Sequence, residues 1–221
     1  MKKVILTTAL GVAVASGTAV AQSADAIIDR AAVAYSRLNS MRAEFHQTLT
    51  NPLTGSTQST SGVILRKKPN LLSITFDSGD RVVADGSTLW AYLPSSVPDQ
   101  VMRMPYNMTA AGSVDPADQF LKSPRTRFTV AAAGAATIGG RATHIVTLTP
   151  RRANNQLRSA KVWIDDSDSS IRQFDVESPN GLRRRVVITR FTANPAISTT
   201  SFRFAPPKGV KVVDQQTLAD F

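Results

Sequence analysis

The fold is decided by residues 62–92, which read GVILRKKPNLLSITFDSGDRVVADGSTLWAY. Four short apolar runs lie in this stretch, and the turn sequences Asp77-Ser78-Gly79-Asp80 and Asp85-Gly86 separate the last three of them. Short runs rich in β-branched and aromatic residues, divided by Asp-Gly turns, are typical of antiparallel hairpins. The stretch therefore predicts four consecutive strands, at residues 63–67, 71–76, 81–84 and 88–92.

The same pattern extends outward in both directions. Upstream, Ala43, Phe45, Gln47 and Leu49 alternate with polar residues, which predicts a half-buried strand, and residues 51–62 are predicted to form a loop. Downstream, strands are predicted at residues 100–104, 127–131, 142–149, 161–164, 171–177, 185–191 and 202–204. Short strands at this spacing indicate one antiparallel sheet, strongly curved or nearly closed, so the predicted fold class is mainly β with helices.

Several strands carry apolar residues on both of their faces. Val186 and Ile188, for example, alternate with the equally apolar Val187. A sheet with one solvated face would alternate more cleanly between apolar and polar residues. A curved sheet whose concave face is covered by the first helix explains this pattern, and an ordinary packed barrel explains it nearly as well.

Two helices are predicted beside the strands. The first is capped by Ser23 or Asp25 and continues to Met41, with its apolar residues near helical spacing. The second is short and starts from Asp115, with Pro116 in its first turn. No internal repeat or linker divides the chain, so residues 22–221 are expected to form a single domain.

Residues 1–21 have the features of a secretory signal peptide. Lys2 and Lys3 make a positive start, and residues 4–14 form an apolar stretch too short to span a bilayer. Residues 19–21 (Ala-Val-Ala) then give the small-x-small pattern that signal peptidase accepts. We therefore expect an exported protein that is cleaved before Gln22, with an N-terminal membrane anchor as the alternative interpretation.

The composition excludes several classes of site. The 221 residues contain no cysteine and two histidines, so disulfides, thiolate metal sites and cysteine nucleophiles are excluded, and a histidine-built metal site is not expected. No Gly-x-Ser-x-Gly elbow or phosphate-binding loop occurs, and we expect neither catalysis nor a cofactor. The 26 basic residues exceed the 16 acidic ones, but no nucleic-acid motif accompanies this charge and no nucleic-acid partner is expected.

Two charged stretches leave alternatives open. Arg183, Arg184 and Arg185 lie at the start of a predicted strand, where such a run is usually solvated. Their functional interpretation is a docking surface for an acidic protein or for anionic lipid headgroups. Residues 166–177 have the acidic spacing of a calcium loop, but Ile171 stands where the sharp turn requires glycine, so a charged hairpin turn is favoured.

Three segments carry a resemblance to a known family. They are residues 62–71 (GVILRKKPNL), 83–92 (VADGSTLWAY) and 202–210 (FRFAPPKGV). In this order they resemble a Gly-x-apolar-x-apolar-x-Lys-Arg-Pro-Asn strand, a Val-Ala-Asp-Gly hairpin and a Phe-x-Phe-x-Pro-Pro-x-Gly-Val ending. All three belong to the LolA family of periplasmic carriers of outer-membrane lipoproteins, and together with the first helix they span nearly the whole mature chain.

The resemblance implies an incomplete, or half, antiparallel β-barrel whose helices form a lid over an apolar cavity. It also implies a soluble periplasmic carrier that holds the acyl chains of lipoproteins. Members take this cargo from an ATP-driven inner-membrane release complex and deliver it to an outer-membrane receptor. That receptor is itself lipid-anchored, which a chain without cysteine cannot be. We expect the carrier to be a monomer.

The residues expected to line the cavity are apolar side chains of the predicted strands and of the first helix. On the strands they are Phe45, Leu65, Leu72, Ile74, Phe76, Trp90 and Tyr92, and beneath the lid they are Ile27, Ile28 and Leu38. Plain core packing is the alternative role for each of them, because the sequence does not assign the alternating residues of a strand to one face.

A latch for the lid is expected at Lys68. The resemblance places there the arginine of the family's Lys-Arg-Pro-Asn motif, which holds the lid shut through hydrogen bonds. Lysine keeps the charge but loses the planar fork of donors, so its contacts with the lid should be weaker. Arg66, two residues earlier and on the same face of the strand, is the second candidate.

Two other functions fit the sequence less well. A periplasmic sensor with the same half-barrel would bind lipid or misassembled lipoprotein, but such proteins usually carry a second domain. A hydrolase of envelope lipids needs a catalytic group, and the motifs supply none. The three functions differ in what the purified protein would carry or do: bound lipoprotein, free lipid, or turnover of lipid.

Overall fold

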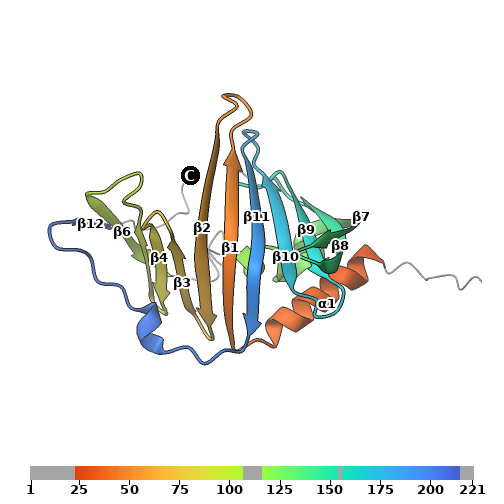
Figure 1. The fold of residues 1–221 in the computed structure, drawn as a ribbon, viewed down its shortest axis with the longest axis horizontal. Helices are drawn as coiled ribbons and strands as arrows, with labels where there is room; N and C mark the ends of the chain where they lie inside the picture. Colours follow the sequence, from red (N-terminus) through yellow and green to blue (C-terminus); the bar gives the residue numbers. More distant parts are fainter. Residues whose placement is uncertain (1–22, 107–115, 154–155, 215–221) are drawn as a thin grey trace, which may run out of the picture.

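The computed structural model of the chain describes residues 23–106, 116–153 and 156–214. Within these residues twelve strands form one sheet (Figure 1). They are β1 (Ser40–Thr50), β2 (Thr57–Lys67), β3 (Leu71–Phe76), β4 (Arg81–Asp85), β5 (Thr88–Tyr92), β6 (Gln100–Pro105), β7 (Phe128–Ile138), β8 (Arg141–Pro150), β9 (Ser159–Asp165), β10 (Ile171–Glu177), β11 (Arg183–Ala193) and β12 (Lys211–Asp214). The expected signal peptide, residues 1–21, and the expected cap Asp115 lie outside the described residues.

The helices in the described part of the chain are α1 (Ala24–Ser36), α2 (Pro116–Leu121), α3 (Pro124–Arg127) and the 3-10 helix η1 (Thr199–Phe202). The hydroxyl of Ser23 accepts a hydrogen bond from the amide of Ala26 at 3.2 Å, so Ser23 is the cap of α1. None of these helices has the length and apolar character that crossing a bilayer requires.

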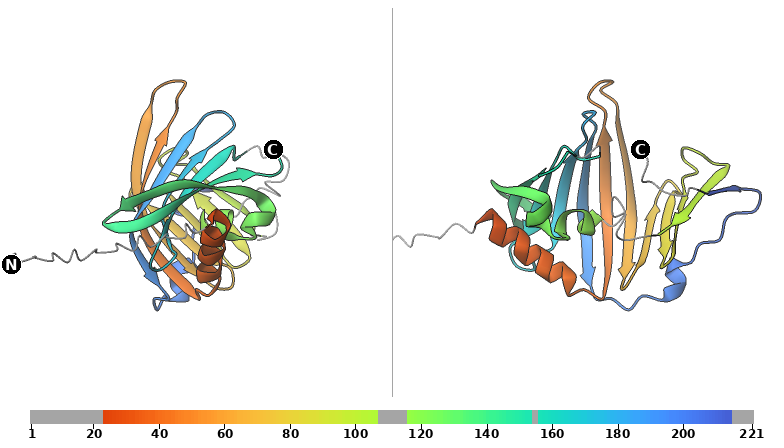
Figure 2. Two further views of the ribbon diagram at one scale, coloured as in Figure 1. Left: turned by 90° about the vertical axis from the view of Figure 1, so that its right-hand side faces the viewer. Right: turned by 180° about the vertical axis from the view of Figure 1, so that it is seen from behind.

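Two meanders build the sheet. The strand order is β12-β6-β5-β4-β3-β2-β1-β11-β10-β9-β8-β7, and all neighbours are antiparallel except β12, which runs parallel to β6. The pairing of β1 with β11 joins the two meanders in the middle, while β12 and β7 remain the two edges. The sheet is bent, and α1 lies along one side of it (Figure 2). The structure thus confirms the predicted fold, which is mainly β with an open, unclosed antiparallel sheet.

Some predicted boundaries differ from the structure. β2 begins at Thr57, within the predicted loop, because Ser and Thr side chains pair across β1 and β2, as Thr48 and Ser59 do at 3.3 Å between their hydroxyls. The strand predicted at residues 202–204 is wrong. Phe202 ends η1, and Pro206 and Pro207, which cannot donate to a ladder, follow shortly after, so the chain stays outside the strands until β12.

The register of the strands separates two apolar faces. Ile64 lies opposite Ala43 on β1 and opposite Ile74 on β3, so these side chains share one face, which we call the inner face. The next row, Leu65, Ser73, Val83 and Trp90, points to the other side, the outer face. On the side of the inner face, α1 packs on β7, β8 and β9. The outer face is covered by the chain between β11 and β12, where η1 packs on β3 and β4.

Gly62 allows close packing on the inner face. A Cβ at this position would lie 2.8 Å from Cζ of Phe45, because the Phe45 ring lies directly against the backbone of β2. Phe45 in turn meets Phe76 edge to face, with ring centroids 5.5 Å apart. This part of the sheet is therefore filled by its own side chains.

Candidate functional site

An apolar cavity of about 250 Å³ lies between the C-terminal half of α1 and the inner face. Residues of α1 form one wall, and β1, β2, β10 and β11 form the other, with the β9–β10 turn at the rim. The lining residues are Ala34, Tyr35, Leu38, Met41, Ala43, Ile64, Leu121, Asp168, Ser169, Ser170, Ile171, Phe174, Ile188, Phe191 and Ala193. The lining is largely apolar, so the cavity favours hydrocarbon over water.

The cavity is small for a binding site. Pockets for small molecules typically hold about 300–1,000 Å³, and this one holds about 250 Å³. The hollow has room for a segment of hydrocarbon.

The predicted lining residues occupy three places. Leu38 lines the cavity. Six others are buried or half-buried around it, on the inner face or under α1, without bordering the hollow: Ile27, Ile28, Phe45, Leu72, Ile74 and Phe76. The remaining three, Leu65, Trp90 and Tyr92, lie on the outer face.

The aromatic residues of the outer face contact the C-terminal segment instead of a cavity. The ring of Phe204 lies 5.7 Å from that of Trp90 and 6.3 Å from that of Tyr92, measured between centroids. The indole of Trp90 also donates to Asp85 at 3.1 Å. These contacts tie down residues 199–204 and make Trp90 and Tyr92 part of a packed layer.

Sequence reasoning missed the second wall of the cavity. Phe174, Ile188 and Phe191 come from β10 and β11, and they reach the cavity because β11 pairs with β1. On β2 the lining residue is Ile64, one position before the predicted Leu65. The alternation of β1 could have located this face, because Ala43 and Phe45 are buried while Glu44 and His46 are less so.

Arg66 connects the sheet to two helices. Its guanidinium lies over the ring of Tyr35 on α1, 4.7 Å from the centroid, and 3.8 Å from Oδ1 of Asp118 on α2. The side chains of Arg66 and Asp118 are only 13% and 14% exposed, so water screens this ion pair little.

Lys68 also contacts α1. Its Nζ donates to the carbonyl oxygen of Ser36, the last residue of α1, at 2.6 Å. The side chain is exposed, in contrast to that of Arg66. A third contact joins α1 to α3, where Nη1 of Arg125 lies 3.0 Å from Oδ2 of Asp29. The helical side of the cavity is therefore held by a small set of polar contacts, two of them at the predicted latch residues.

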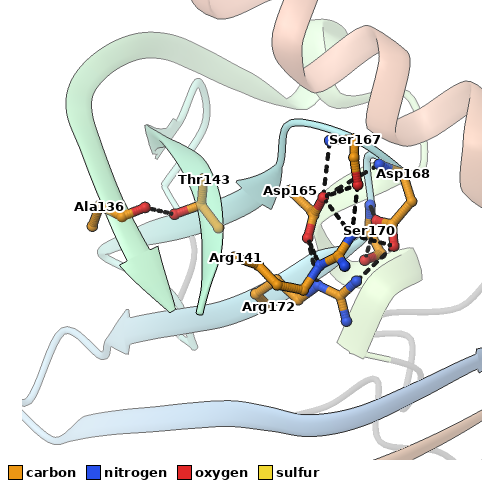
Figure 3. A network of polar contacts seen from close by, with 8 residues as sticks. All are labelled: Ala136, Arg141, Thr143, Asp165, Ser167, Asp168, Ser170 and Arg172. Carbon is orange, nitrogen blue, oxygen red and sulfur yellow. Dashed lines mark hydrogen bonds and ion pairs between the residues drawn. The ribbon is translucent and has the colours of Figure 1, made fainter. Parts of the chain in front are cut away.

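A polar network fixes the β9–β10 turn at the rim of the cavity (Figure 3). The buried carboxylate of Asp165 accepts hydrogen bonds from Arg141, from Nε of Arg172 at 2.9 Å and from the hydroxyl of Ser167 at 2.8 Å. Arg172 also binds Asp168 at 2.6 Å. Burial raises the pKa of the Asp165 carboxyl, but the hydrogen bonds from Arg141, Ser167 and Arg172 outweigh it and hold this pKa well below its usual range.

The acidic residues noticed in residues 166–177 have partners in the protein: Asp168 belongs to this network, Asp166 lies beside His144 and Glu177 beside Arg158. The carboxylates of the network bind arginine side chains and backbone amides of the turn, as in a charged hairpin. Within the described residues, no group of three or more His, Asp or Glu side chains could hold a metal ion. The turn is therefore a rigid part of the cavity rim.

Comparison with known proteins gives three findings. Residues 36–205 match the family described as "Outer membrane lipoprotein carrier protein LolA". An outer-membrane lipoprotein carrier protein of Serratia proteamaculans is 26% identical and aligns over 98% of this chain and 100% of its own length. The same holds, with the same identity and coverage, for the protein of that name from Erwinia tasmaniensis.

A solved structure has a similar fold. It is an uncharacterized conserved protein of Thermus thermophilus, with a TM-score of 0.57 and 13% sequence identity, and the match covers 88% of this chain and 100% of the other. The likeness concerns the arrangement of the strands alone, since the two sequences have diverged widely.

Proposed function

Because the chain belongs to the LolA family of outer-membrane lipoprotein carrier proteins, we propose that its cavity receives the acyl chains of lipoproteins and carries them through the periplasm. The observation that carries this proposal is the apolar hollow between α1 and the inner face, next to a helix that a few polar contacts hold in place. The proposal includes no catalytic step and no cofactor.

The energetics require a carrier of this kind. Burial of one methylene group is worth roughly 0.8 kcal/mol, so an acyl chain of about sixteen carbons is worth about 12 kcal/mol. Such a chain does not leave a bilayer for water at a useful rate. A cavity that offers comparable apolar surface makes the transfer nearly neutral, and a loose fit permits release.

The proposed lid is α1 together with α2. In the closed form Arg66 and Lys68 hold these helices against the sheet, and breaking their contacts lets the hollow expand along the inner face. The side chains that the expanding cavity would expose are those already buried there, above all Phe45, Leu72 and Ile74. In this proposal Arg66 is the main latch and Lys68 an auxiliary one.

The route of the cargo follows from the family. We propose that the chain is exported, cleaved after Ala21, and acts as a monomer in the periplasm. It would take lipoproteins from an ATP-driven release complex in the inner membrane and pass them to an outer-membrane receptor. The bare apolar cavity suits this role, because it recognises the acyl chains that all such cargo shares.

Photocrosslinking in the periplasm tests the proposal. A photoreactive phenylalanine analogue replaces Phe191, which lines the cavity, or Tyr92, which lies half-buried on the outer face and serves as the matched control. We expect crosslinks to lipoproteins, identified by mass spectrometry, from position 191 and none from position 92. Crosslinks from position 92 alone, or no lipoprotein at either position, would reject carriage in this cavity.

A further inference from the structure

Five basic side chains gather at one end of the sheet, where β1 and β10 end and β9 and β11 begin. We call them the basic rim: Arg158, Lys161, Arg183, Arg184 and Arg185. The register places Lys161, Arg183 and Arg185 on one face, because Arg183 lies opposite both Thr50 and Glu177, and Arg185 lies opposite Asp175, which lies opposite Lys161. Arg184 lies between them along β11, opposite Val176, and Arg158 directly precedes β9.

The basic rim carries an excess of positive charge. Arg185 pairs with Asp175, with Nη2 and Oδ2 2.7 Å apart, and Arg158 lies 3.4 Å from Glu177. Among the residues that the structure describes, no carboxylate forms an ion pair with Lys161, Arg183 or Arg184. Arg184 is half-buried, and burial lowers the pKa of its guanidinium. Desolvated and surplus cations of this kind are stabilised by an external anion.

An exposed apolar tip stands beside the rim. Leu53, in the β1–β2 turn, is 85% exposed, the highest value among the exposed large hydrophobic residues of the described chain. Two hydrogen bonds fix the turn: the amide of Leu53 donates to Oδ1 of Asn51 at 3.0 Å, and the amide of Asn51 donates to the carbonyl of Ser56 at 2.9 Å. Leu53 is therefore presented to solvent by an ordered turn.

The tip and the rim belong to one end of the molecule. The β1–β2 and β10–β11 hairpins lie side by side there, with the β1–β2 hairpin reaching farthest (Figure 1). A Cβ at Gly181 would lie 3.4 Å from the ring of Pro52, so the two tips are in contact. Leu53 follows Thr50 by three residues, which is at most about 10 Å at roughly 3.3 Å per residue. This distance is close to the Debye length of about 8 Å at physiological ionic strength.

We propose that this end of the protein docks on an anionic phospholipid bilayer, with Leu53 entering the interface and the basic rim facing the headgroup phosphates. An exposed apolar side chain ahead of a group of cations is the usual pattern of peripheral membrane binding. An acidic protein would complement the positive charge of the basic rim, but its charge would not explain why an ordered turn exposes Leu53 to solvent. The docking does not depend on cargo, because the cavity and its lid lie elsewhere.

Vesicle sedimentation tests the docking directly. The purified chain without cargo is mixed with vesicles of phosphatidylcholine, alone or with phosphatidylglycerol. We expect binding to the mixed vesicles only, and loss of binding when the Debye length is reduced to about 3 Å at about 1 M salt. The double variant Lys161→Gln/Arg183→Gln should bind about 25-fold more weakly, at about fivefold for each cation.

Matched variants separate docking from general effects. Leu53→Ser should weaken binding by about tenfold, whereas Val33→Ser, a change at an exposed residue of α1, should leave it unchanged. Arg203→Gln/Lys208→Gln removes two exposed cations from the C-terminal segment and should also have little effect. Equal binding to neutral vesicles, or equal loss in both double variants, would overturn the proposal. A lack of binding to any vesicle would also overturn the proposal, and an acidic protein would then be the better candidate for the partner of the basic rim.

Discussion

Replacement of Arg66 by glutamine should release the lid without unfolding the sheet. The contact with Tyr35 at 4.7 Å is a desolvated cation–π pair, worth about 1 kcal/mol or somewhat more. The ion pair with Asp118 at 3.8 Å adds about 1 kcal/mol, because both side chains are largely buried. Glutamine keeps most of the length of the side chain but loses both contacts, so the closed form should lose about 2 kcal/mol relative to the open one.

A change of 2 kcal/mol shifts the open–closed equilibrium by roughly 30-fold. Since a ligand binds only the open form, the apparent dissociation constant for a fluorescent fatty acid should fall by up to that factor. Hydrogen exchange of the α1 amides should accelerate by a similar factor, because these amides exchange when the helix leaves the sheet. The free energy of unfolding of the sheet, from urea titration, should change by a smaller amount.

Lys68→Gln is the matched control. Its exposed hydrogen bond to the Ser36 carbonyl is worth about 1 kcal/mol, which corresponds to at most about a fivefold change in the same assays. The reasoning fails if Lys68→Gln has the larger effect, or if Arg66→Gln changes neither fatty-acid affinity nor exchange of the α1 amides.

Two further variants probe the scaffold of the cavity. Asp165→Asn should lower the free energy of unfolding by about 3 kcal/mol at pH 7, because it leaves Arg141 and Arg172 without their shared carboxylate. A folded-state pKa held well below the ordinary value of 3.8 adds stability that is fully present above about pH 4 and is lost gradually as the pH falls from there towards the folded-state pKa. In urea titrations the difference between wild type and variant should therefore narrow from pH 7 to pH 3 without closing, and exposed Asp166→Asn should change little. Gly62→Ala should cost about 2 kcal/mol in the same titration, because the new methyl group meets the backbone carbonyl oxygen of Thr75 and the Phe45 ring. An unchanged stability would contradict the close packing described at Gly62.

Local signals in the sequence were sufficient for the open sheet and for every described strand except β12, which was not predicted. The Asp85-Gly86 turn and the short apolar runs around it give β4 and β5 where they were predicted. The hydroxyl of Ser23 marked the start of α1 correctly. These features depend on neighbours a few residues away, so a single sequence contains the information that determines them.

The faces of the strands could not be predicted in the same way. Val82 and Val83, or Leu89 and Trp90, are about equally apolar, because β4 and β5 are covered on both sides, by the core on one side and by the C-terminal segment on the other. Without knowledge of that second cover, Trp90 looks as suitable for a cavity as Leu89 does. The cavity wall that contains Phe191 could not be predicted for a related reason. It depends on the pairing of β1 with β11, which lies about 140 residues later in the chain.

The strength of the proposed latch affects the direction in which cargo is transferred. If the latch holds about 2 kcal/mol, it equals the burial of two to three methylene groups, at roughly 0.8 kcal/mol each. From water, a long acyl chain would therefore open the lid easily. In a bilayer or in another carrier the acyl chain is already buried. Its transfer into this cavity then costs about the free energy needed to break the latch. In the proposed route, the energy needed to open the lid therefore favours release of the acyl chain over its retention. Loading at the inner membrane is the uphill step, and it must be coupled to a source of energy. Weakening the latch at Arg66 should then improve loading and slow delivery together.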